Sequence, residues 1–346
     1  MKKNGWLYML PLTMYAAAWM SFTGGYGWAW VPVVIGFIVI PALEALLPTD
    51  TTNLGEHEER KAKKARRYDY FLYLVVACQY AALYLFLTTM QQEMPGWVRA
   101  GRIAAMGILC GSFGINAGHE LGHRKHQPDN ALARLSLLTS LYMHFTTEHN
   151  KGHHKYVGTP QDPTSARLGE NLYHFWLRSF AGTIASAWKI ARTEQVQKQR
   201  SWLRNEMVLI LVTETTFCLL VALLFGLYPL LCFLLAAGIG ILLLSTVNYI
   251  EHYGLTRKPT AGNQYERTRA HHSWNSNHVL GRFMLFELSR HSDHHYLASR
   301  KYQLLRHHEQ SPELPTGYPG SMLLSLVPPL WFRIMNKKIE SIKPNA

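Results

Sequence analysis

Eight histidines lie in three short clusters, far more than chance would place there. The chain holds 18 histidines in 346 residues, so windows of this size should contain about one. The clusters are "HELGH", "HNKGHH" and "RHSDHH", which supply His119, His123, His149, His153, His154, His291, His294 and His295. On a helix, residues three or four apart share a face. The spacing therefore predicts that each cluster aims paired imidazoles at one place, with His149 and His153 on one face and His154 at its flank.

Imidazoles in this number indicate a metal centre. They are ligands of iron, copper, zinc or nickel rather than of magnesium or calcium. "HELGH" also fits the H-E-x-x-H pattern of zinc proteases, in which Glu120 would act as the base. One four-coordinate zinc would leave most of the clustered histidines without a role. We therefore favour two metal ions with open positions, and we add His252 in "NYIEHYGL" as a ninth candidate ligand.

The other histidines and the cysteines give weaker signals. Three histidines in "HHSWNSNH" remain open as ligands, namely His271, His272 and His278. Isolated histidines are usually surface or satisfied core residues, which is our interpretation of His57, His126, His144, His174, His307 and His308. The four cysteines lie in apolar runs and form no C-x-x-C pair, which indicates core residues rather than disulfides or zinc-thiolate and iron–sulfur sites: Cys78, Cys110, Cys218 and Cys232.

Long uncharged runs predict an all-α integral membrane protein. The first such run, from Gly5 to Leu43, is too long for a signal peptide, so we expect no cleavable signal. Six runs have the length that crosses a bilayer as a helix. They are Trp6 to Thr23, Trp28 to Leu47, Tyr70 to Met90, Gly101 to Gly118, Val208 to Phe225 and Leu230 to Ile250.

The remaining chain predicts a helical cap that carries the histidines. Residues 1–118 would hold spans one to four and residues 208–250 spans five and six. Residues 119–207, with the first two clusters, and 251–346, with the third, would fold together on the cytoplasmic side as part of one cooperative domain. The apolar segment "SMLLSLVPPLWF" is too short and too proline-broken to span.

The net charge of +13 gives the orientation. Lys and Arg gather at the N-terminus, at residues 59–67 and after spans four and six, so the positive-inside rule places both termini in the cytoplasm. Excess positive charge also fits attraction to anionic lipid headgroups. No segment looks like a nucleic-acid-reading domain, so we expect no nucleic-acid partner.

Two features inside the spans concern helix packing. Gly107, Gly111, Gly114 and Gly118 are spaced four, three and four residues apart, which predicts one small-residue face that packs closely and ends at His119. Glu214 lies in the fifth run, where a charge is costly. It indicates either a partner inside the bundle or a span that begins later, and we favour the later start.

Four motifs together resemble the integral-membrane alkane 1-monooxygenases of bacteria. They are "HELGH", "EHNKGHHKYVGTPQDP", "NYIEHYGL" and "SRHSDHH". Fatty-acid desaturases and related hydroxylases share the histidine boxes, whereas "NYIEHYGL", "HHSWNSNH" and "LPTGYPG" are more specific. "SRHSDHH" has Ser289 where the family often has Gln, which leaves the ligands untouched. The resemblance implies an inner-membrane enzyme with two iron ions held by the eight box histidines and His252. It would use O2 to convert the terminal methyl of medium- or long-chain n-alkanes into 1-alkanols.

The resemblance also implies that electrons come from rubredoxin, which rubredoxin reductase and NAD(P)H would reduce. This chain has no C-x-x-C pair to build rubredoxin, so the donor would be a separate protein or a fused domain outside this sequence. Five acidic residues beside the boxes are candidates to orient ligand rings through their free N–H groups: Glu120, Glu148, Asp162, Glu251 and Asp293. The alternatives are a membrane desaturase or fatty-acid hydroxylase, a zinc-dependent membrane protease and a metal transporter.

Overall fold

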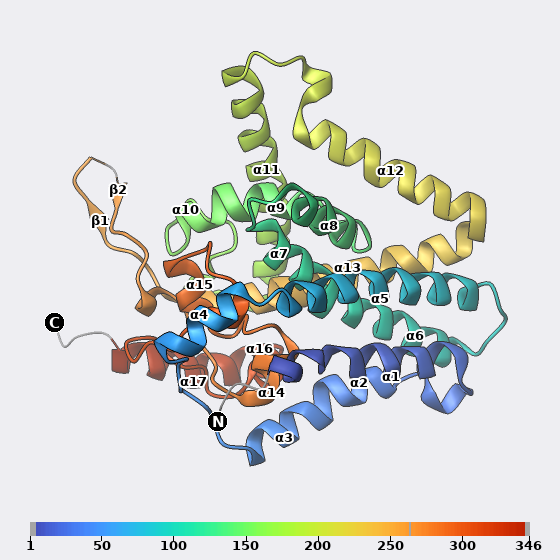
Figure 1. Cartoon of the computed structure of the whole chain (residues 1–346), viewed down its shortest axis with the longest axis horizontal. Coiled ribbons are helices and arrows are strands. Elements are labelled where there is room, and N and C mark those ends of the chain that lie inside the picture. The colour runs from blue at the N-terminus through green and yellow to red at the C-terminus, as the bar shows by residue number, and fades with distance from the viewer. Residues whose placement is uncertain (1–4, 263, 343–346) are drawn as a thin grey trace.

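The fold is a bundle of long helices with shorter helices gathered at one end, as the ribbon of Figure 1 shows. In this computed structural model, residues 5–262 and 264–342 are described. The α-helices are α1 (Pro11–Thr23), α2 (Val31–Val34), α3 (Ile40–Leu46), α4 (Glu56–Lys64), α5 (Arg67–Met90), α6 (Gly96–Ile108), α7 (Asn116–Gly122), α8 (Gln127–Leu138), α9 (Phe145–Glu148), α10 (His154–Tyr156), α11 (Leu172–Gln197), α12 (Glu206–Phe225), α13 (Leu227–His252), α14 (Val279–Met284), α15 (His291–Tyr296), α16 (Tyr318–Ser325) and α17 (Pro328–Ile342).

Irregular helical turns interrupt or precede several of these helices. Three of them are π-helical: η3 (Ile35–Val39), η4 (Leu109–Ile115) and η5 (His149–His153). The 3₁₀ turns are η1 (Gly5–Met9), η2 (Tyr26–Trp28), η6 (Trp202–Arg204), η7 (Ala270–His272) and η8 (Tyr302–Leu304). In the described part of the chain the two strands, β1 (Pro259–Thr260) and β2 (Gln264–Tyr265), form one short antiparallel hairpin in which Pro259 pairs with Tyr265.

Within residues 5–262 and 264–342, five helical segments are long and apolar enough to cross a membrane. Each has 20 to 27 residues, and at about 1.5 Å per residue that length reaches across the roughly 30 Å hydrocarbon core. They are Tyr26–Leu46, Arg67–Met90, Gly96–Gly122, Glu206–Phe225 and Leu227–His252. The prediction of an all-α, multi-pass membrane protein is therefore confirmed.

The predicted count of six spans is not confirmed. The first predicted span, Trp6 to Thr23, is divided into η1 and the 13-residue helix α1. Pro11 begins α1, because proline lacks the N–H that would continue the preceding turn and fits the first helical position. Thirteen residues rise about 20 Å, which is shorter than the hydrocarbon core.

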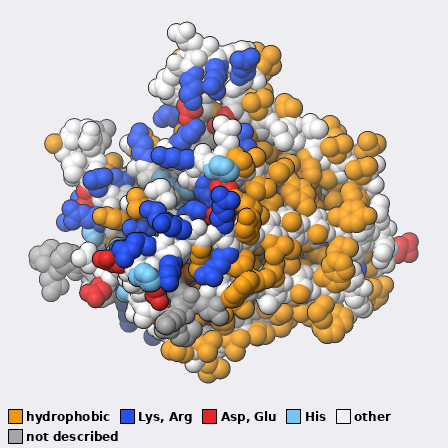
Figure 2. All heavy atoms as spheres, in the orientation of Figure 1, with side chains coloured by type: hydrophobic (Ala, Val, Ile, Leu, Met, Phe, Trp, Pro, Cys, Tyr) orange, Lys and Arg blue, Asp and Glu red, His pale blue; other side chains and the backbone are white. Residues whose placement is uncertain are grey.

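The surface divides into an apolar half and a basic half. In Figure 2 hydrophobic side chains cover the half that holds the long helices, and Lys and Arg cover the other half. Leu219, Leu223 and Leu227 are 65%, 80% and 72% exposed, which suits contact with lipid tails rather than water. Trp28, Trp30 and Trp97 are also exposed, as tryptophans of a membrane–water interface are.

Glu214 corrects one prediction. Helix α12 begins at Glu206, earlier than the predicted start of the fifth span, so a later start does not explain the half-buried carboxylate. Instead, Glu214 Oε1 accepts the backbone N–H of Met143 at 2.9 Å. The alternative that we did not favour, an interior partner, is the one that the structure shows.

The four glycines of the fourth predicted span do not share one face. Gly107 and Gly111 pack against α13, because a Cβ at either position would lie within 2.6 Å of Ile239 or of the Gly240 carbonyl. Gly114 instead faces Gln79, and Gly118 faces Leu137 of α8. The π-helix η4 contains Gly111 and Gly114 and has more residues per turn than an α-helix, so the α-helical spacing no longer aligns the two pairs.

The apolar segment near the C-terminus does not span, as predicted. It is divided between α16 and α17, with the break before Pro328. Tyr318 in α16 and Trp331 in α17 are buried, so both helices pack on the body of the protein.

Candidate metal centre

Five separate elements bring the nine predicted histidines together. His119 lies in α7 and His123 follows it directly; His149 and His153 lie in η5, and His154 begins α10. His252 ends the long helix α13, and α15 carries His291, His294 and His295. Two membrane-spanning segments, Gly96–Gly122 and Leu227–His252, thus each end at the centre with a histidine in the last turn.

The ring nitrogens form two adjacent groups. The first histidine group is His119, His123, His149, His154 and His294, and the second histidine group is His153, His252, His291 and His295. Within each group the candidate ligand atoms lie within 4.8 Å of one another. Nε2 of His119 lies 3.0 Å from Nε2 of His294 in the first group, and Nε2 of His252 lies 3.1 Å from Nε2 of His291 in the second.

The π-helix η5 explains how the second histidine cluster is divided. We expected His149 and His153 to share a face, but they belong to different groups, and His149 pairs with His154 instead, Nε2 to Nε2 at 3.0 Å. A π-helix has hydrogen bonds from residue i to i+5 and more residues per turn than an α-helix, so the α-helical rule that positions 149 and 153 share a face does not apply here. His153 is thereby free to face His295, at 3.1 Å between their Nε2 atoms.

Burial keeps most of these rings neutral. It lowers the pKa of His149, His154 and His294 well below the ordinary value, and the neighbouring imidazoles lower it further. Burial likewise lowers the pKa of His123 to about 4. A neutral imidazole has a free lone pair on one nitrogen, which is the form that binds a metal.

The donor set fits two transition-metal ions. Nine imidazoles converge in two groups, and facing nitrogens 2.8–3.1 Å apart are close to the edge of a coordination polyhedron whose metal–nitrogen bonds are about 2.1 Å. Thiolates are absent from both groups, which disfavours a soft-metal site.

Asp162 is one of two predicted carboxylates that reach a clustered ring. Its Oδ2 lies 2.9 Å from Nδ1 of His153, and both side chains are buried. Thr164 and Ser165 donate their hydroxyls to the same carboxylate. Burial opposes ionisation of Asp162, but His153 and these hydrogen bonds prevail and lower its pKa to about 2. Asp162 is therefore an anion that fixes the His153 ring with Nε2 directed toward the second group.

Glu251 is the second predicted carboxylate that reaches a clustered ring. Its Oε1 lies 3.2 Å from Nδ1 of His291 and accepts the hydroxyl of Tyr318 at 2.6 Å. Sequence reasoning assigned no role to Tyr318, although the residue lies in "LPTGYPG", one of the motifs that make the family resemblance specific. A hydroxyl in the wall of a cavity is thus linked through one carboxylate to a ring of the second histidine group.

The other three predicted carboxylates have different partners. Glu120 accepts hydrogen bonds from Arg124 and from the backbone N–H of Tyr302. Glu148 accepts the hydroxyl of Ser186. Both carboxylate oxygens of Asp293 accept hydrogen bonds from Arg300, and one of them also pairs with Nε2 of His308. In the described residues none of the three carboxylates hydrogen-bonds to a ring nitrogen of the two groups; each instead connects chain segments around the centre.

Three histidines outside the two groups lie in other surroundings: His271, His272 and His144. His271, His272 and Glu266 form a third small cluster. There, Nδ1 of His272 accepts the backbone N–H of Arg269 at 2.9 Å, so in the neutral ring Nε2 carries the proton and faces Glu266 at 3.4 Å. A ring used in this way has no free lone pair for a metal. His144 is buried against Tyr142, and burial lowers its pKa to about 4.

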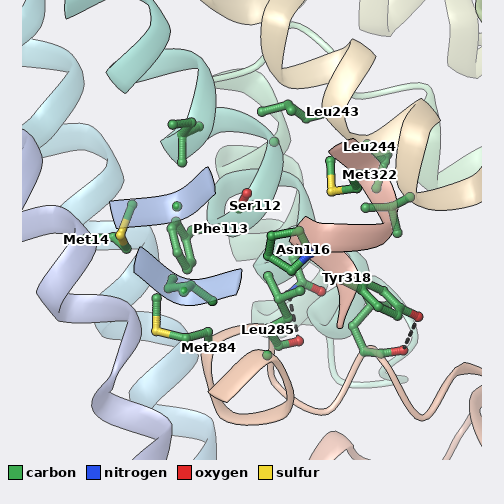
Figure 3. Close-up of a pocket in the computed structure, with 18 of the residues that line it drawn as sticks. Met14, Ser112, Phe113, Asn116, Leu243, Leu244, Met284, Leu285, Tyr318 and Met322 are labelled. Atoms are coloured by element: carbon green, nitrogen blue, oxygen red, sulfur yellow. Dashed lines mark hydrogen bonds between the residues drawn. The ribbon is translucent and has the colours of Figure 1, made fainter. Parts of the chain in front are cut away.

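An apolar cavity lies among the helices next to the centre. Figure 3 shows side chains from several elements around it, among them Met14, Phe113, Leu243, Met284 and Met322. Its volume is about 70 Å³, and its polar side chains are those of Ser112, Asn116 and Tyr318. Asn116 is fixed because its Nδ2 donates to the Leu285 carbonyl at 2.8 Å. Asn116 precedes His119 by one turn and Leu288 precedes His291 by three residues, so the cavity wall continues into the centre.

A strained turn joins the cavity wall to the third histidine cluster. Phe286 and Glu287 both have left-handed backbone angles, with φ of 52° and 57°. Such a conformation costs about 1 kcal/mol or more per residue and persists where other contacts enforce it. Arg282 supplies one of them, since its Nε donates to Glu287 Oε2 at 2.8 Å in full burial. The turn places Leu285 and Leu288 in the cavity wall directly before His291.

Residues 95–321 of the chain match the fatty acid desaturase family, which covers the part that carries all nine histidines. The chain is thus a membrane protein of the fatty acid desaturase class, with a histidine-rich centre at the ends of its spanning helices.

Full-length relatives define the protein more closely. The chain is 36% identical to the alkane 1-monooxygenase of Ectopseudomonas oleovorans, over 98% of this chain and 86% of that protein. It is 37% identical to the alkane 1-monooxygenase of Pseudomonas putida, over 98% and 85%, and 38% identical to alkane 1-monooxygenase 1 of Alcanivorax borkumensis, over 91% and 78%. The chain belongs to the alkane 1-monooxygenase family, and it is an oxidoreductase of the monooxygenase type.

Proposed function

We propose that this enzyme hydroxylates the terminal methyl of medium- or long-chain n-alkanes to 1-alkanols, using two iron ions and O2. The observation that carries the proposal is the small apolar cavity whose wall residues Asn116 and Leu288 lie three positions before His119 and His291, two of the nine converging imidazoles. The iron ligands would be those of the first histidine group for one ion and those of the second for the other. The names of the relatives support the substrate class.

Iron is the metal that suits this reaction. When bound, two iron ions would supply the strong oxidant needed to break an unactivated methyl C–H bond, which redox-inert zinc cannot do. One oxygen atom of O2 enters the alcohol and the other leaves as water. Two electrons and two protons are consumed for each alcohol that forms. The electrons therefore have to come from outside the chain.

The cavity residues would bind and orient the substrate. An alkane offers no charge and no hydrogen bond, so only shape and apolar burial can position it. Each buried CH₂ is stabilised by about 0.8 kcal/mol relative to water, and the bilayer already concentrates such molecules. Because the cavity is small, a chain end fits it better than a bent mid-chain segment, which favours attack at the terminal carbon. The packed walls also exclude water from the reacting end.

Asp162 and Glu251 would orient the ligand rings. Asp162 holds His153, and Glu251, itself held by Tyr318, lies against His291. Carboxylates in these positions fix the ring orientation and raise the basicity of the ligand nitrogen. The Asn116 side chain, fixed to the Leu285 carbonyl, would mark the boundary between the apolar cavity and the polar centre.

Rubredoxin, as a separate protein or a fused domain, is the proposed electron donor, reduced in turn by rubredoxin reductase and NAD(P)H. A polar hollow of about 600 Å³ reaches His123 from the surface, and His123 belongs to the first histidine group. Its rim carries the cations Arg66, Lys125 and Arg300. Positive charge at this opening would attract an acidic redox protein to a place where a partly exposed ligand ring, His123, lines the hollow.

The membrane orientation is part of the same proposal. Lys and Arg are concentrated on the half of the molecule that bears the centre (Figure 2). Under the positive-inside rule that half, with both termini, faces the cytoplasm of a bacterial inner membrane. There, residues 119–207 and 251–346 would form one cap with the spans, and cytoplasmic rubredoxin would have access to the centre.

A desaturase or fatty-acid hydroxylase is the nearest alternative, because it would use a similar histidine set. Its substrate carries a headgroup or carrier, whereas this cavity offers no charged side chain to bind one. A zinc protease would need Glu120 free to act as a base, but Arg124 and Tyr302 bind its carboxylate. A metal transporter would hold its ligands mid-membrane, and these lie at the ends of the spanning segments.

The test is product analysis with the reconstituted, iron-loaded enzyme. We expect a series of n-alkanes, with O2 and reduced rubredoxin, to give 1-alkanols, and metal analysis to find two irons per chain. His294→Ala should abolish product, whereas His174→Ala, at an exposed ring, should not. Formation of an alkene, or product formation by a protein that contains one zinc and no iron, would refute the proposal.

A further inference from the structure

A basic hollow lies between α8, the end of α11 and the start of α12, with Lys151 of η5 also in its wall. Its volume is about 410 Å³. Lys198, Arg200 and Arg204 line one part of it, while Leu209, Ile210 and Thr213 of the spanning helix α12 line another. A charged compartment therefore continues directly onto an apolar wall that enters the membrane.

The charges of the hollow are unbalanced. Five cations line it, against the two carboxylates of Glu194 and Glu206. Both carboxylates are already shared: Glu194 binds Lys151 and Lys198, and Glu206 binds Arg134 at 3.1 Å. Within the described residues neither Arg200 nor Arg204 forms an ion pair, so two guanidinium groups are left for an anion from outside the chain.

The cationic rim is held in a fixed shape. Asn205 caps α12, because its Oδ1 accepts the Met207 N–H at 2.9 Å, and its Nδ2 donates to Gln195 Oε1 at 3.1 Å. Gln195 in turn donates to the Arg200 carbonyl. One side chain of α11 thus fixes both sides of the turn that carries the two arginines, which reduces the ordering cost of binding a ligand there.

The turn also carries the residue types of a membrane interface. Trp202 and Leu203, between the two arginines, are 64% and 58% exposed, and α12 enters the apolar half of the molecule immediately after them. In Figure 2 a group of Lys and Arg side chains lies beside hydrophobic ones over the α11 end of the molecule. Alternating Trp, Leu and Arg are typical of a segment in the headgroup region.

We infer that this hollow is a binding site for the phosphate of an anionic phospholipid. Arg200 and Arg204 bind the phosphate, and one acyl chain lies along Leu209 and Thr213 of α12. A guanidinium fork matches phosphate oxygens, and basic hollows beside spanning helices select anionic headgroups. The apolar wall favours a lipid over free phosphate or an acidic protein, since neither of these would use it.

The experiment compares lipid retention by the iron-loaded protein and two charge variants. The protein is exchanged into phosphatidylcholine nanodiscs that contain a minor fraction of phosphatidylglycerol, washed with detergent, and analysed by native mass spectrometry. The test variant is Arg200→Gln/Arg204→Gln. The control is Lys63→Gln/Lys64→Gln, which removes the same charge from exposed positions of α4. Parallel samples contain inorganic phosphate in place of phosphatidylglycerol.

We expect native protein and the α4 control to retain one phosphatidylglycerol in preference to phosphatidylcholine. Each cation near a headgroup contributes about fivefold, so the arginine variant should bind phosphatidylglycerol roughly 25-fold more weakly. Iron content should be equal in all three proteins. Equal retention by the arginine variant, or no preference for phosphatidylglycerol, overturns the inference. The inference is also overturned if inorganic phosphate binds to the hollow as tightly as the lipid does.

Discussion

Asp162 Oδ2 lies 2.9 Å from Nδ1 of His153, and both side chains are shielded from solvent. Because Thr164 and Ser165 donate hydrogen bonds to the same carboxylate, Asp162 remains fixed whether or not the centre holds a metal. It can therefore direct Nε2 of His153 toward the second histidine group in advance. Pre-orientation of this kind lowers the cost of assembling a ligand set from distant chain segments.

Replacement of this carboxylate should weaken metal binding more than it changes the fold. Asp162→Asn keeps the shape but removes the negative charge, so we expect iron affinity to fall about 10- to 100-fold. Iron per chain after dialysis against a graded chelator measures the effect. Glu170→Gln is the control, because Glu170 is a buried carboxylate paired with Arg178 away from the centre. Equal iron retention by Asp162→Asn and native protein would show that the ring needs no such support.

Tyr318 should act through Glu251 on His291. Tyr318→Phe keeps the ring in the cavity wall but removes the hydroxyl that donates to Glu251 at 2.6 Å. We expect about tenfold weaker iron binding and an altered spectrum of the iron centre, with alkane affinity nearly unchanged. Tyr249→Phe is the matched control, since that buried hydroxyl donates to the Glu170 carbonyl instead. If both variants change the spectrum alike, the effect is one of packing and not of the Tyr318–Glu251 contact.

The sequence predicted which histidines converge, because cluster spacing and position at span ends are local properties. It did not predict how they divide into five and four. That division depends on η5, where a π-helical repeat pairs His149 with His154 and turns His153 to the other group. Whether a helix widens into a π-turn is decided by the contacts of the whole site, which a spacing rule for α-helices does not contain.

The same limit applies to the spans and the carboxylates. The interior partner of Glu214 is a backbone N–H 71 residues away, and no local pattern reveals such a contact. Four of the five predicted carboxylates lie close to a histidine in sequence, yet of these four only Glu251 contacts a clustered ring. Asp162 contacts His153 although it follows that residue by nine positions. Tyr318 was missed because its partner is 67 residues distant. Long-range partners of buried polar groups are set by tertiary packing, so sequence neighbourhood is a poor guide to them.

The width of the cavity should set the length of alkane that fits. Ser112 lies in its wall in the π-helix η4, so Ser112→Phe would fill part of the 70 Å³ space. We expect the product profile to shift toward shorter alkanols, with a long-chain rate at least about tenfold lower, because overpacking an apolar site costs roughly 1–3 kcal/mol. Competition between a short and a long alkane measures the shift. Ala81→Phe, on the exposed face of α5, should leave the profile unchanged. An unchanged profile for Ser112→Phe would mean that substrate does not use this cavity.

The rim of the hollow at His123 should govern electron delivery. Lys125→Glu reverses a charge that forms no ion pair in the described residues, so we expect a higher KM for reduced rubredoxin and a kcat nearly unchanged at saturation. The difference from native protein should shrink as salt rises, since screening weakens attraction between exposed charges. Lys189→Glu on α11 carries the same charge change at an exposed position outside the hollow and serves as the control. Equal KM values for both variants would place rubredoxin elsewhere.

Acid should release iron at a lower pH than at an ordinary histidine site. Burial lowers the pKa of His123 to about 4 and also lowers those of His149, His154 and His294, so protons compete poorly for these rings above that range. We expect full iron content at pH 5.5 and progressive loss toward pH 4. The contribution of His123 to folding stability also decreases as the pH falls. It is complete above about pH 6.5, where the unfolded chain is also neutral, and it is lost as pH falls through the folded value. Iron content and thermal unfolding, measured from pH 7.5 to 4, check both statements, and half-loss of iron near pH 6.5 would contradict the burial argument.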